Sequence, residues 1–106
     1  INTGGEKVYP EEVEEALKAL PEVIDCNVVG VPDPQWGAAV TAVVELAEGA
    51  DPSDADLVDG LRGSLSGYKL PKNIVRVDSL FRSPNGKSDY KWATRTALDA
   101  LELGGE

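Results

Sequence analysis

Two β-branched apolar runs near the middle of the chain most constrain how it can fold. The first covers Val23 to Val31, the second covers Ala38 to Leu46, and a turn-rich stretch, PDPQWG, connects them. Valine-rich runs of this length are typical of strands, so we predict two strands joined by this turn. The indole of Trp36 in the turn is expected to pack as a lid over the sheet edge, with a ligand platform as the alternative.

Apolar residues at helical spacing predict a helix on each side of these strands. The first helix begins near Pro10 and ends at Pro21, because a proline there cannot extend the hydrogen-bonded ladder. The second has Asp54 as its N-cap, runs to about Leu65 and ends before Gly67.

A third strand and two terminal elements complete the predicted order. Asn73 to Leu80 is predicted as a core strand, and Tyr90 to Leu103 as a closing helix that frays at Gly104 and Gly105. Ile1 to Pro10 is predicted as a hairpin or bent ribbon around a Gly-Gly turn. The fold class is therefore α+β: a small antiparallel or mixed sheet packed with about three helices, in the order β-hairpin, α, β, β, α, β, loop, α.

With 106 residues the chain is one small domain, and we expect it to be a piece of a longer soluble protein. It contains no methionine and opens on Ile1 in mid-pattern, without a recognisable signal peptide. No apolar run approaches the roughly 18 residues that a membrane span needs. The lone Cys26 lies in an apolar segment, where a small buried thiol is expected rather than a nucleophile. We expect a reducing, cytoplasmic location, with peripheral attachment to a membrane left open.

The charges are unevenly distributed along the chain. The net charge of −9 argues against general nucleic-acid binding. Residues 62–95 nevertheless hold eight of the ten bases and two of the nineteen acids. Such a division would concentrate a small anionic ligand on one part of the surface. A chance grouping of solvated charges is the alternative.

The sequence lacks the residues of a complete active site. It contains no histidine, which excludes Ser-His and Cys-His nucleophilic sites and most metal clusters, so we predict no metal ligands. Neither a GxxxxGK[ST] loop nor a GxGxxG fingerprint is present. Carboxylate pairs such as Glu11 and Glu15 are expected to be solvated on a helix face. What the chain can supply is a cationic group to a site formed elsewhere.

The strongest candidate for that group is Lys87, in the stretch FRSPNGKSDY. Turn residues Ser83 to Gly86 precede it, and their backbone leaves the next side chain projecting from a loop. A lysine in this position can reach a phosphate or a developing carboxylate oxygen in a partner cleft as a point donor. On residue types alone, a solvated lysine beside a hairpin turn is the alternative.

Four motifs give the chain a resemblance to a known family. In order they are TGGEKVYPEEVEEAL, VVGVPDPQWG, GYKLPK and RSPNGK. Together they resemble the small C-terminal domain of the adenylate-forming enzymes, which are acyl-CoA synthetases, adenylation domains of peptide synthetases and luciferases. The resemblance spans nearly the whole chain, and the ending PNGKSDYKW is similar to that of bacterial fatty-acyl-CoA synthetases. It implies that residues 1–106 are one C-terminal domain, and that a large N-terminal domain with the ATP and acid sites belongs upstream.

The resemblance implies a two-step ligase reaction with ATP, Mg²⁺ and CoA. A carboxylate attacks the α-phosphate of ATP to give an acyl-adenylate, and the CoA thiol then displaces AMP. The small domain of the family rotates on a hinge between the steps and presents one face for each. The implied partners are the enzyme's own large domain, a carboxylic acid such as a fatty acid, ATP and CoA, with no nucleic acid and no transmembrane segment. The large domain would bind most of these ligands, so we expect no cofactor on this fragment and no activity from it alone.

The resemblance also assigns roles to individual residues of the candidate loop. Lys87 matches the adenylation lysine, which bridges carboxylate and phosphate oxygens as charge builds. Asn85 and Gly86 match the residues that shape its loop. This role needs a permanently charged, mobile donor rather than a base of tuned pKa.

A second set of roles concerns thioester formation. Gly5 matches the glycine that lines the pantetheine tunnel, where any Cβ would narrow the path; a plain turn glycine is the alternative. Lys7 matches a basic position near the nucleotide, and Arg62 falls where some members place a phosphate-contacting arginine. Gly4 stands where many members have serine. The hinge residue and the ribose-binding aspartate would lie upstream of Ile1.

Other functions remain open on the sequence alone. The chain could belong to an adenylation domain that loads a carrier protein, or to a ligase for aryl or short acids. A function of another class is a non-catalytic module that binds CoA or another anion. A Ser/Thr/Gly-rich phosphate loop a few hundred residues before Ile1 would favour the enzyme.

Overall fold

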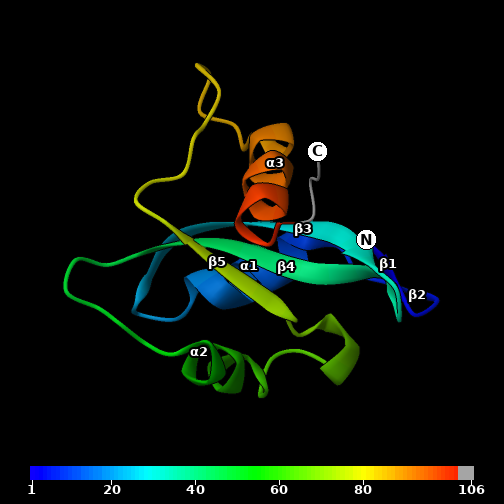
Figure 1. The fold of residues 1–106 in the computed structure, drawn as a ribbon. Helices are drawn as coiled ribbons and strands as arrows, with labels where there is room; N and C mark the ends of the chain where they lie inside the picture. Colours follow the sequence, from blue (N-terminus) through cyan, green and yellow to red (C-terminus); the bar gives the residue numbers. More distant parts are fainter. Residues whose placement is uncertain (103–106) are drawn as a thin grey trace.

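A three-stranded sheet forms the middle layer of the computed structural model, which describes residues 1–102 (Figure 1). The strand order is β3-β4-β5, from β3 (Val23–Asp33), β4 (Gly37–Leu46) and β5 (Asn73–Val77). The strands β3 and β4 are antiparallel, whereas β4 and β5 are parallel. A separate two-stranded hairpin, β1 (Asn2–Thr3) and β2 (Glu6–Lys7), opens the chain.

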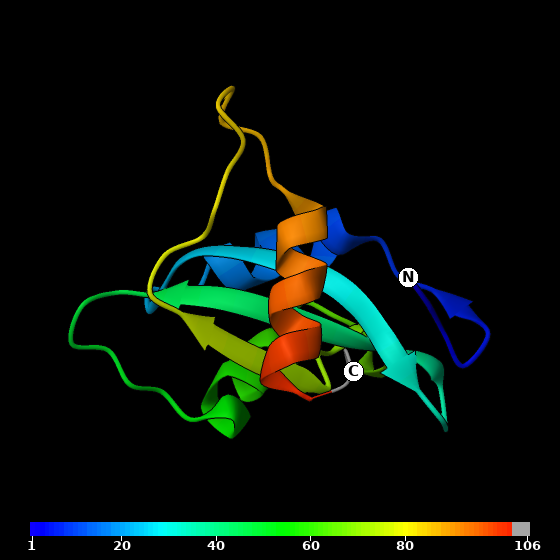
Figure 2. The same ribbon diagram turned by 45° about the horizontal axis from the view of Figure 1, so that its top comes forward.

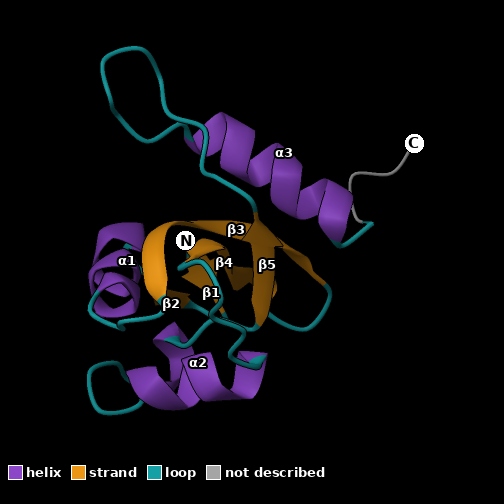
Figure 3. Cartoon of the chain, turned by 90° about the vertical axis from the view of Figure 1, so that its left-hand side faces the viewer, coloured by secondary structure: helices purple, strands orange, loops and turns teal. Residues whose placement is uncertain are grey.

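Helices cover both faces of the central sheet (Figures 2 and 3). The helices α1 (Pro10–Lys18) and α2 (Asp54–Leu61) lie on one face, and α3 (Tyr90–Ala100) lies alone on the other. A short 3-10 helix, η1 (Gly67–Lys69), precedes β5. Within residues 1–102, no helix is both long and apolar enough to cross a membrane.

The alternating faces of the strands produce two separate apolar clusters. On the α1 and α2 side, the helices bury Val13, Leu17, Leu57 and Leu61 against β3 and β4. On the α3 side, the small residues Ala93 and Ala97 pack against valines of all three strands, which are Val29, Val31, Val43 and Val75. Because α3 contacts the sheet through alanines, it lies close to the strands.

A β-bulge in β3 determines which face Asp25 occupies. The pairing with β4 shifts by one residue between Val23 and Asp25, and the intervening Ile24 is exposed. A one-residue shift changes the face on which every following side chain lies. Val23 therefore joins the cluster under α1, while Asp25 shares the α3 side with Val29.

The predicted fold class and the order of the elements are confirmed. The sequence-based bounds agree closely with the N-terminal hairpin and with both long strands. They also agree with the start of the first helix and the start of the last one. Cys26 is buried, and Glu11 and Glu15 are exposed on α1, as expected.

The prediction for the second helix was wrong at both ends. Its N-cap is Ser53 rather than Asp54. The Ser53 hydroxyl accepts a hydrogen bond from the Asp56 amide, and the Asp56 carboxylate accepts one from the Ser53 amide. This reciprocal pair is a capping box. The helix ends at Leu61, and the chain continues through a turn. Gly67 begins η1 instead of ending the helix.

Two other predicted elements are shorter than expected. The strand predicted over residues 73–80 ends at Val77, because its pairing with β4 ends at the Glu45–Val77 pair. Beyond this pair, the Leu80 amide donates to the Glu45 carboxylate (3.1 Å). The closing helix ends at Ala100. The predicted end at Leu103 and the fraying at Gly104 and Gly105 lie outside the described residues.

Candidate functional site

The Lys87 loop, residues 82–88, connects β5 to α3 and stands away from the sheet in Figures 1 and 2. Its shape is held by its own hydrogen bonds. The Ser83 amide donates to the Lys87 carbonyl (3.0 Å), and the Gly86 amide donates to the Ser83 carbonyl (2.8 Å). Gly86 has a φ of +82°, which glycine adopts without strain. The Lys87 side chain is exposed, so the loop presents a cation to solvent or to a partner.

An ion pair fastens the start of the loop to β3. The Arg82 guanidinium donates to both carboxylate oxygens of Asp25, through Nε (3.0 Å) and Nη2 (2.6 Å). A third donor, Nη1, reaches the hydroxyl of Ser88 at the other side of the loop (2.9 Å). Both charged side chains are less than one-third exposed. A hydrogen-bonded, partly buried pair of this kind is stronger than an exposed ion pair.

The end of the loop is fastened to α1. Asp89 caps α3 by accepting from the Trp92 amide (3.0 Å). The hydroxyl of Tyr90 lies 3.0 and 2.9 Å from the two carboxylate oxygens of Glu14, to which it donates. Glu14 is 6% exposed and also accepts from the Val28 amide (2.8 Å). Burial raises the pKa of Glu14, and burial followed by the bond to Glu14 raises the pKa of Tyr90 to about 12.

The Gly4–Gly5 hairpin lies at another end of the sheet (Figure 1). Gly4 donates to the Trp36 carbonyl (2.8 Å), and a Cβ at Gly4 would lie 2.8 Å from the indole ring. The amine of Lys72 lies over the same ring, 4.6 Å from its centroid. The Trp36 ring therefore contacts the hairpin and Lys72, but the residue is 38% exposed, and its role as a lid over the sheet edge stays a prediction. Gly5 has a φ of +87°, and a Cβ there would meet no atom within 4 Å.

The predicted site residues thus fall into three groups. Asn85, Gly86 and Lys87 share one loop, and the Asn85 carboxamide oxygen accepts from the Lys87 amide (3.4 Å). Gly5 and Lys7 share the N-terminal hairpin, where Lys7 is exposed. Arg62 follows α2 and forms an exposed ion pair with Asp59 (3.0 Å). The structure does not bring the three groups together.

Half of the eight bases in residues 62–95 are balanced by acids from elsewhere in the chain. Arg62, Lys69, Arg76 and Arg82 pair with Asp59, Glu12, Asp54 and Asp25. Among residues 1–102, the other four, Lys72, Lys87, Lys91 and Arg95, have no ion-pair partner, and the Lys72 amine lies over the Trp36 ring. The region of unpaired positive charge is therefore smaller than the sequence suggested, and apart from Lys72 it lies on the Lys87 loop and α3.

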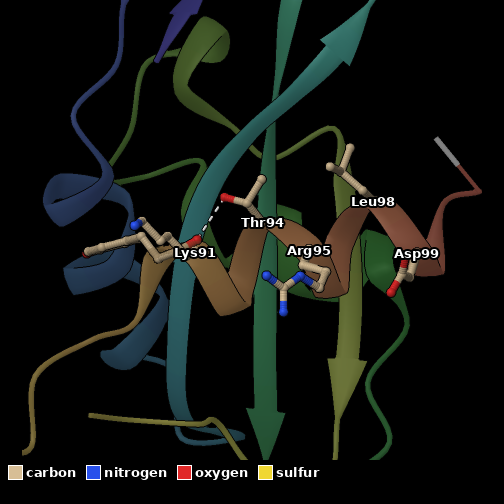
Figure 4. A pocket seen from close by; sticks show the side chains of 6 residues that line it. Lys91, Thr94, Arg95, Leu98 and Asp99 are labelled. Carbon is tan, nitrogen blue, oxygen red and sulfur yellow. Dashed lines mark hydrogen bonds between the residues drawn. The ribbon is translucent and has the colours of Figure 1, made fainter. Parts of the chain in front are cut away.

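Two of these cations line an open groove of about 540 Å³ along α3, which the sequence analysis did not predict (Figure 4). Its lining residues are Tyr90, Lys91, Thr94, Arg95, Leu98 and Asp99. The spacing of four residues between Lys91 and Arg95 is the sequence signal that places them on one face. Thr94 donates to the Tyr90 carbonyl (2.8 Å), drawn as a dashed line in Figure 4, so its hydroxyl is already used.

Comparison with known proteins places these features in a family. The sequence model of the AMP-binding enzyme C-terminal domain matches residues 12–87, well over half of the chain, and its match ends at Lys87. The chain belongs to the AMP-binding enzyme C-terminal domain family. Family membership agrees with the resemblance that the four sequence motifs indicate.

Relatives of this C-terminal domain are named as CoA ligases. The chain is 56% identical over 93 residues to a medium/long-chain-fatty-acid–CoA/3-oxocholest-4-en-26-oate–CoA ligase of Mycobacterium tuberculosis, covering 88% of this chain and 17% of that protein. It therefore spans about one-sixth of the length of that relative.

Solved structures show the same fold. Apo MatB from Rhodopseudomonas palustris matches with a TM-score of 0.87 and 39% identity, over 94% of this chain and 20% of that one. A Mycobacterium tuberculosis fatty acyl CoA synthetase also matches with a TM-score of 0.87, at 31% identity over 94% of this chain and 20% of that one.

The AMP-binding C-terminal domain carries no nucleophile of its own at Cys26. Burial raises the pKa of this thiol to about 12, so it stays protonated at neutral pH. Its Sγ lies 3.6 Å from the Glu14 carbonyl, within the core. Within residues 1–102, no three Cys, Asp or Glu side chains converge to hold a metal ion. These residues therefore do not fit a Mg²⁺ site.

Sequence reasoning missed the residues that fasten the loop. The sequence analysis gave Glu14 no role, but the structure buries it on α1. Its position next to Val13 in the helical repeat was the available signal. Asp25 and Arg82 are 57 residues apart, and no local pattern links them.

Proposed function

We propose that this chain is the mobile C-terminal domain of an ATP-dependent, AMP-forming acyl-CoA synthetase that activates a fatty acid. A large N-terminal domain, outside the 106 residues, would bind the acid, ATP and most of CoA. The observation that supports this proposal best is Lys87, an exposed cation at the end of the family match and on a loop of defined shape.

Lys87 would act in the first step. A carboxylate oxygen of the acid attacks the α-phosphorus of ATP, and pyrophosphate leaves. The Lys87 ammonium would donate to carboxylate and phosphate oxygens. It would thereby stabilise the negative charges of these two groups as they approach each other. Lys87 needs no proton transfer for this role, only reach and position.

Gly5 would act in the second step, in which the CoA thiol attacks the acyl carbonyl and AMP leaves. The open space beside Gly5 would leave room for the pantetheine arm along the hairpin. Lys7, on the same hairpin, and Arg62 are the bases proposed to contact nucleotide phosphates. Because the hairpin and the Lys87 loop lie apart on the domain, a rotation of this domain would be needed to bring each to the same acyl-adenylate.

The test uses the full-length enzyme that contains this chain. ATP–pyrophosphate exchange is measured with fatty, short-chain and aryl acids, followed by acyl-CoA formation with the acids that support exchange. We expect exchange and thioester formation with fatty acids. Exchange restricted to aryl or short acids would replace the substrate class, and exchange without acyl-CoA formation would favour a carrier protein as acceptor. No exchange with any acid would favour a non-catalytic CoA- or anion-binding module.

A further inference from the structure

The Lys87 loop has internal hydrogen bonds that hold its shape, but its tip makes few contacts with the rest of the fold. The residues of the tip, Pro84 to Lys87, are exposed. The hydrogen bonds of Ser83, Gly86 and Lys87 stay within the loop. Such bonds preserve the shape of the loop but do not determine its direction relative to the sheet. That direction depends on how the two ends of the loop are attached.

Polar contacts attach one end of the loop to β3 and the other end to α1. At the start, Arg82 forms its two-oxygen pair with Asp25 of β3. At the end, Tyr90 donates to Glu14 of α1, and Glu14 is itself bonded to the Val28 amide of β3. Val28 and Asp25 belong to the same strand, so both attachments reach β3 within three residues of each other.

Each attachment restrains more than one degree of freedom. The planar guanidinium of Arg82 meets the Asp25 carboxylate through two nitrogens and ties Ser88 through a third, which fixes orientation as well as distance. Tyr90 is the first residue of α3, so its bond to Glu14 fixes the start of the helix and the chain entering it. Two attachments at separate points prevent the loop from tilting about either one.

We infer that Asp25, Arg82, Glu14 and Tyr90 are positioning residues that aim Lys87 at the reacting oxygens in the adenylation step. The inference rests on the proposed function, since it assigns these residues to the step that Lys87 serves. They act through the loop and do not touch the substrate. Loss of one attachment should therefore slow adenylation and leave the thioester step, which uses the hairpin, unchanged.

The experiment compares Asp25→Asn and Tyr90→Phe with a matched pair elsewhere in the full-length enzyme. Each variant removes one attachment and keeps the size of the side chain. The control is Asp54→Asn, which removes the carboxylate from another Arg–Asp pair, Arg76–Asp54 (2.6 Å), located between α2 and β5. Arg82→Lys is added because it keeps the charge but loses the planar fork. ATP–pyrophosphate exchange, acyl-CoA formation from preformed acyl-adenylate and melting temperature are measured for each protein.

We expect Asp25→Asn and Tyr90→Phe to lower the maximal exchange rate by about 10- to 100-fold, as a displacement of about 1 Å of a catalytic group does. The KM for ATP and the thioester rate should remain those of the wild type. Arg82→Lys should fall between Asp25→Asn and the wild type, and Asp54→Asn should retain full exchange.

The inference is overturned if exchange in Asp25→Asn and Tyr90→Phe equals that of Asp54→Asn, or if exchange and thioester formation fall together. It is also overturned if exchange falls only in proportion to a lowered melting temperature. A wild-type enzyme without exchange would instead disprove the proposed function, and the inference with it.

Discussion

The Gly4–Gly5 hairpin and the Lys87 loop hold their proposed functional residues in place by different means. The tip of the hairpin is packed against another segment, since Gly4 bonds to the Trp36 carbonyl and its Cα faces the indole. The tip of the Lys87 loop is free of such packing and is oriented from its two ends. Changes at the hairpin tip should therefore affect stability together with function, whereas changes at Lys87 should affect function alone.

The largest expected effect is that of Lys87→Ala. Removing the cation should lower ATP–pyrophosphate exchange in the full-length enzyme by about 10²–10³-fold, as loss of one preorganised donor does. Thioester formation from preformed adenylate and the melting temperature should not change, because the side chain is exposed. Lys91→Ala, which removes a neighbouring exposed lysine, is the control and should retain exchange. An equal loss in both half-reactions would contradict the assignment.

Gly5→Leu should have the opposite effect on the two half-reactions. Thioester formation should fall by about 10- to 100-fold through obstruction of the CoA path, with exchange retained. A leucine at positive φ also costs about 1–3 kcal/mol of stability. Gly49→Leu is the matched control, because Gly49 has a φ of +82° and equally open surroundings but lies between β4 and α2. If Gly49→Leu slows thioester formation as much as Gly5→Leu, the tunnel role is wrong.

Gly4→Ala tests how strongly the hairpin depends on its packing. A methyl group there would lie 2.8 Å from Trp36 Cε3, and overpacking of this kind costs about 1–3 kcal/mol. Urea unfolding of the 106-residue chain should show this loss. The double variant with Trp36→Ala has no clash. Its loss of stability should therefore be smaller than the sum of the losses of the two single variants. Strict additivity would mean that the backbone at Gly4, rather than the indole, sets the cost.

The smallest expected effect is a pH dependence from Glu14. Burial raises the pKa of Glu14 above its ordinary value of 4.5, so the folded chain binds this proton more tightly than the unfolded chain. The free energy of unfolding should therefore decrease as pH rises from 4.5 through the raised pKa. Glu14→Gln removes this titration. The stability of the wild type relative to the variant should fall over that pH range in urea unfolding, and a constant difference would show that Glu14 does not titrate there.

The fold was largely predictable because its signals are local. The β-branched runs and the helical repeats specify their own elements over windows of about ten residues. The Lys87 loop was equally accessible, since SPNG is a run of turn residues directly before the lysine. Errors occurred at element ends, where neighbouring residues compete: Ser53 and Asp54 both make good N-caps, and only the bond to Asp56 distinguishes them.

The attachments of the loop were not predictable from local patterns. Tyr90 and Glu14 are 76 residues apart, and Arg82 and Asp25 are 57 residues apart. In the sequence each of these residues is typical of a solvated position, and the partners meet only once α1 and α3 are packed on the sheet. The bulge at Ile24 adds a further condition, because without the one-residue shift Asp25 and Val23 would lie on the same face.

By itself, the sequence determined the strands, the helices, the family and the exposed lysine, because each depends on residues that are neighbours in the chain. The tertiary structure alone decided which acids neutralise which bases, so that on the Lys87 loop and α3 the cations Lys87, Lys91 and Arg95 have no ion-pair partner among residues 1–102. It also decided how the Lys87 loop is aimed. Ion pairs and hydrogen bonds act over a few ångströms, and only the packed sheet brings such distant residues within that range.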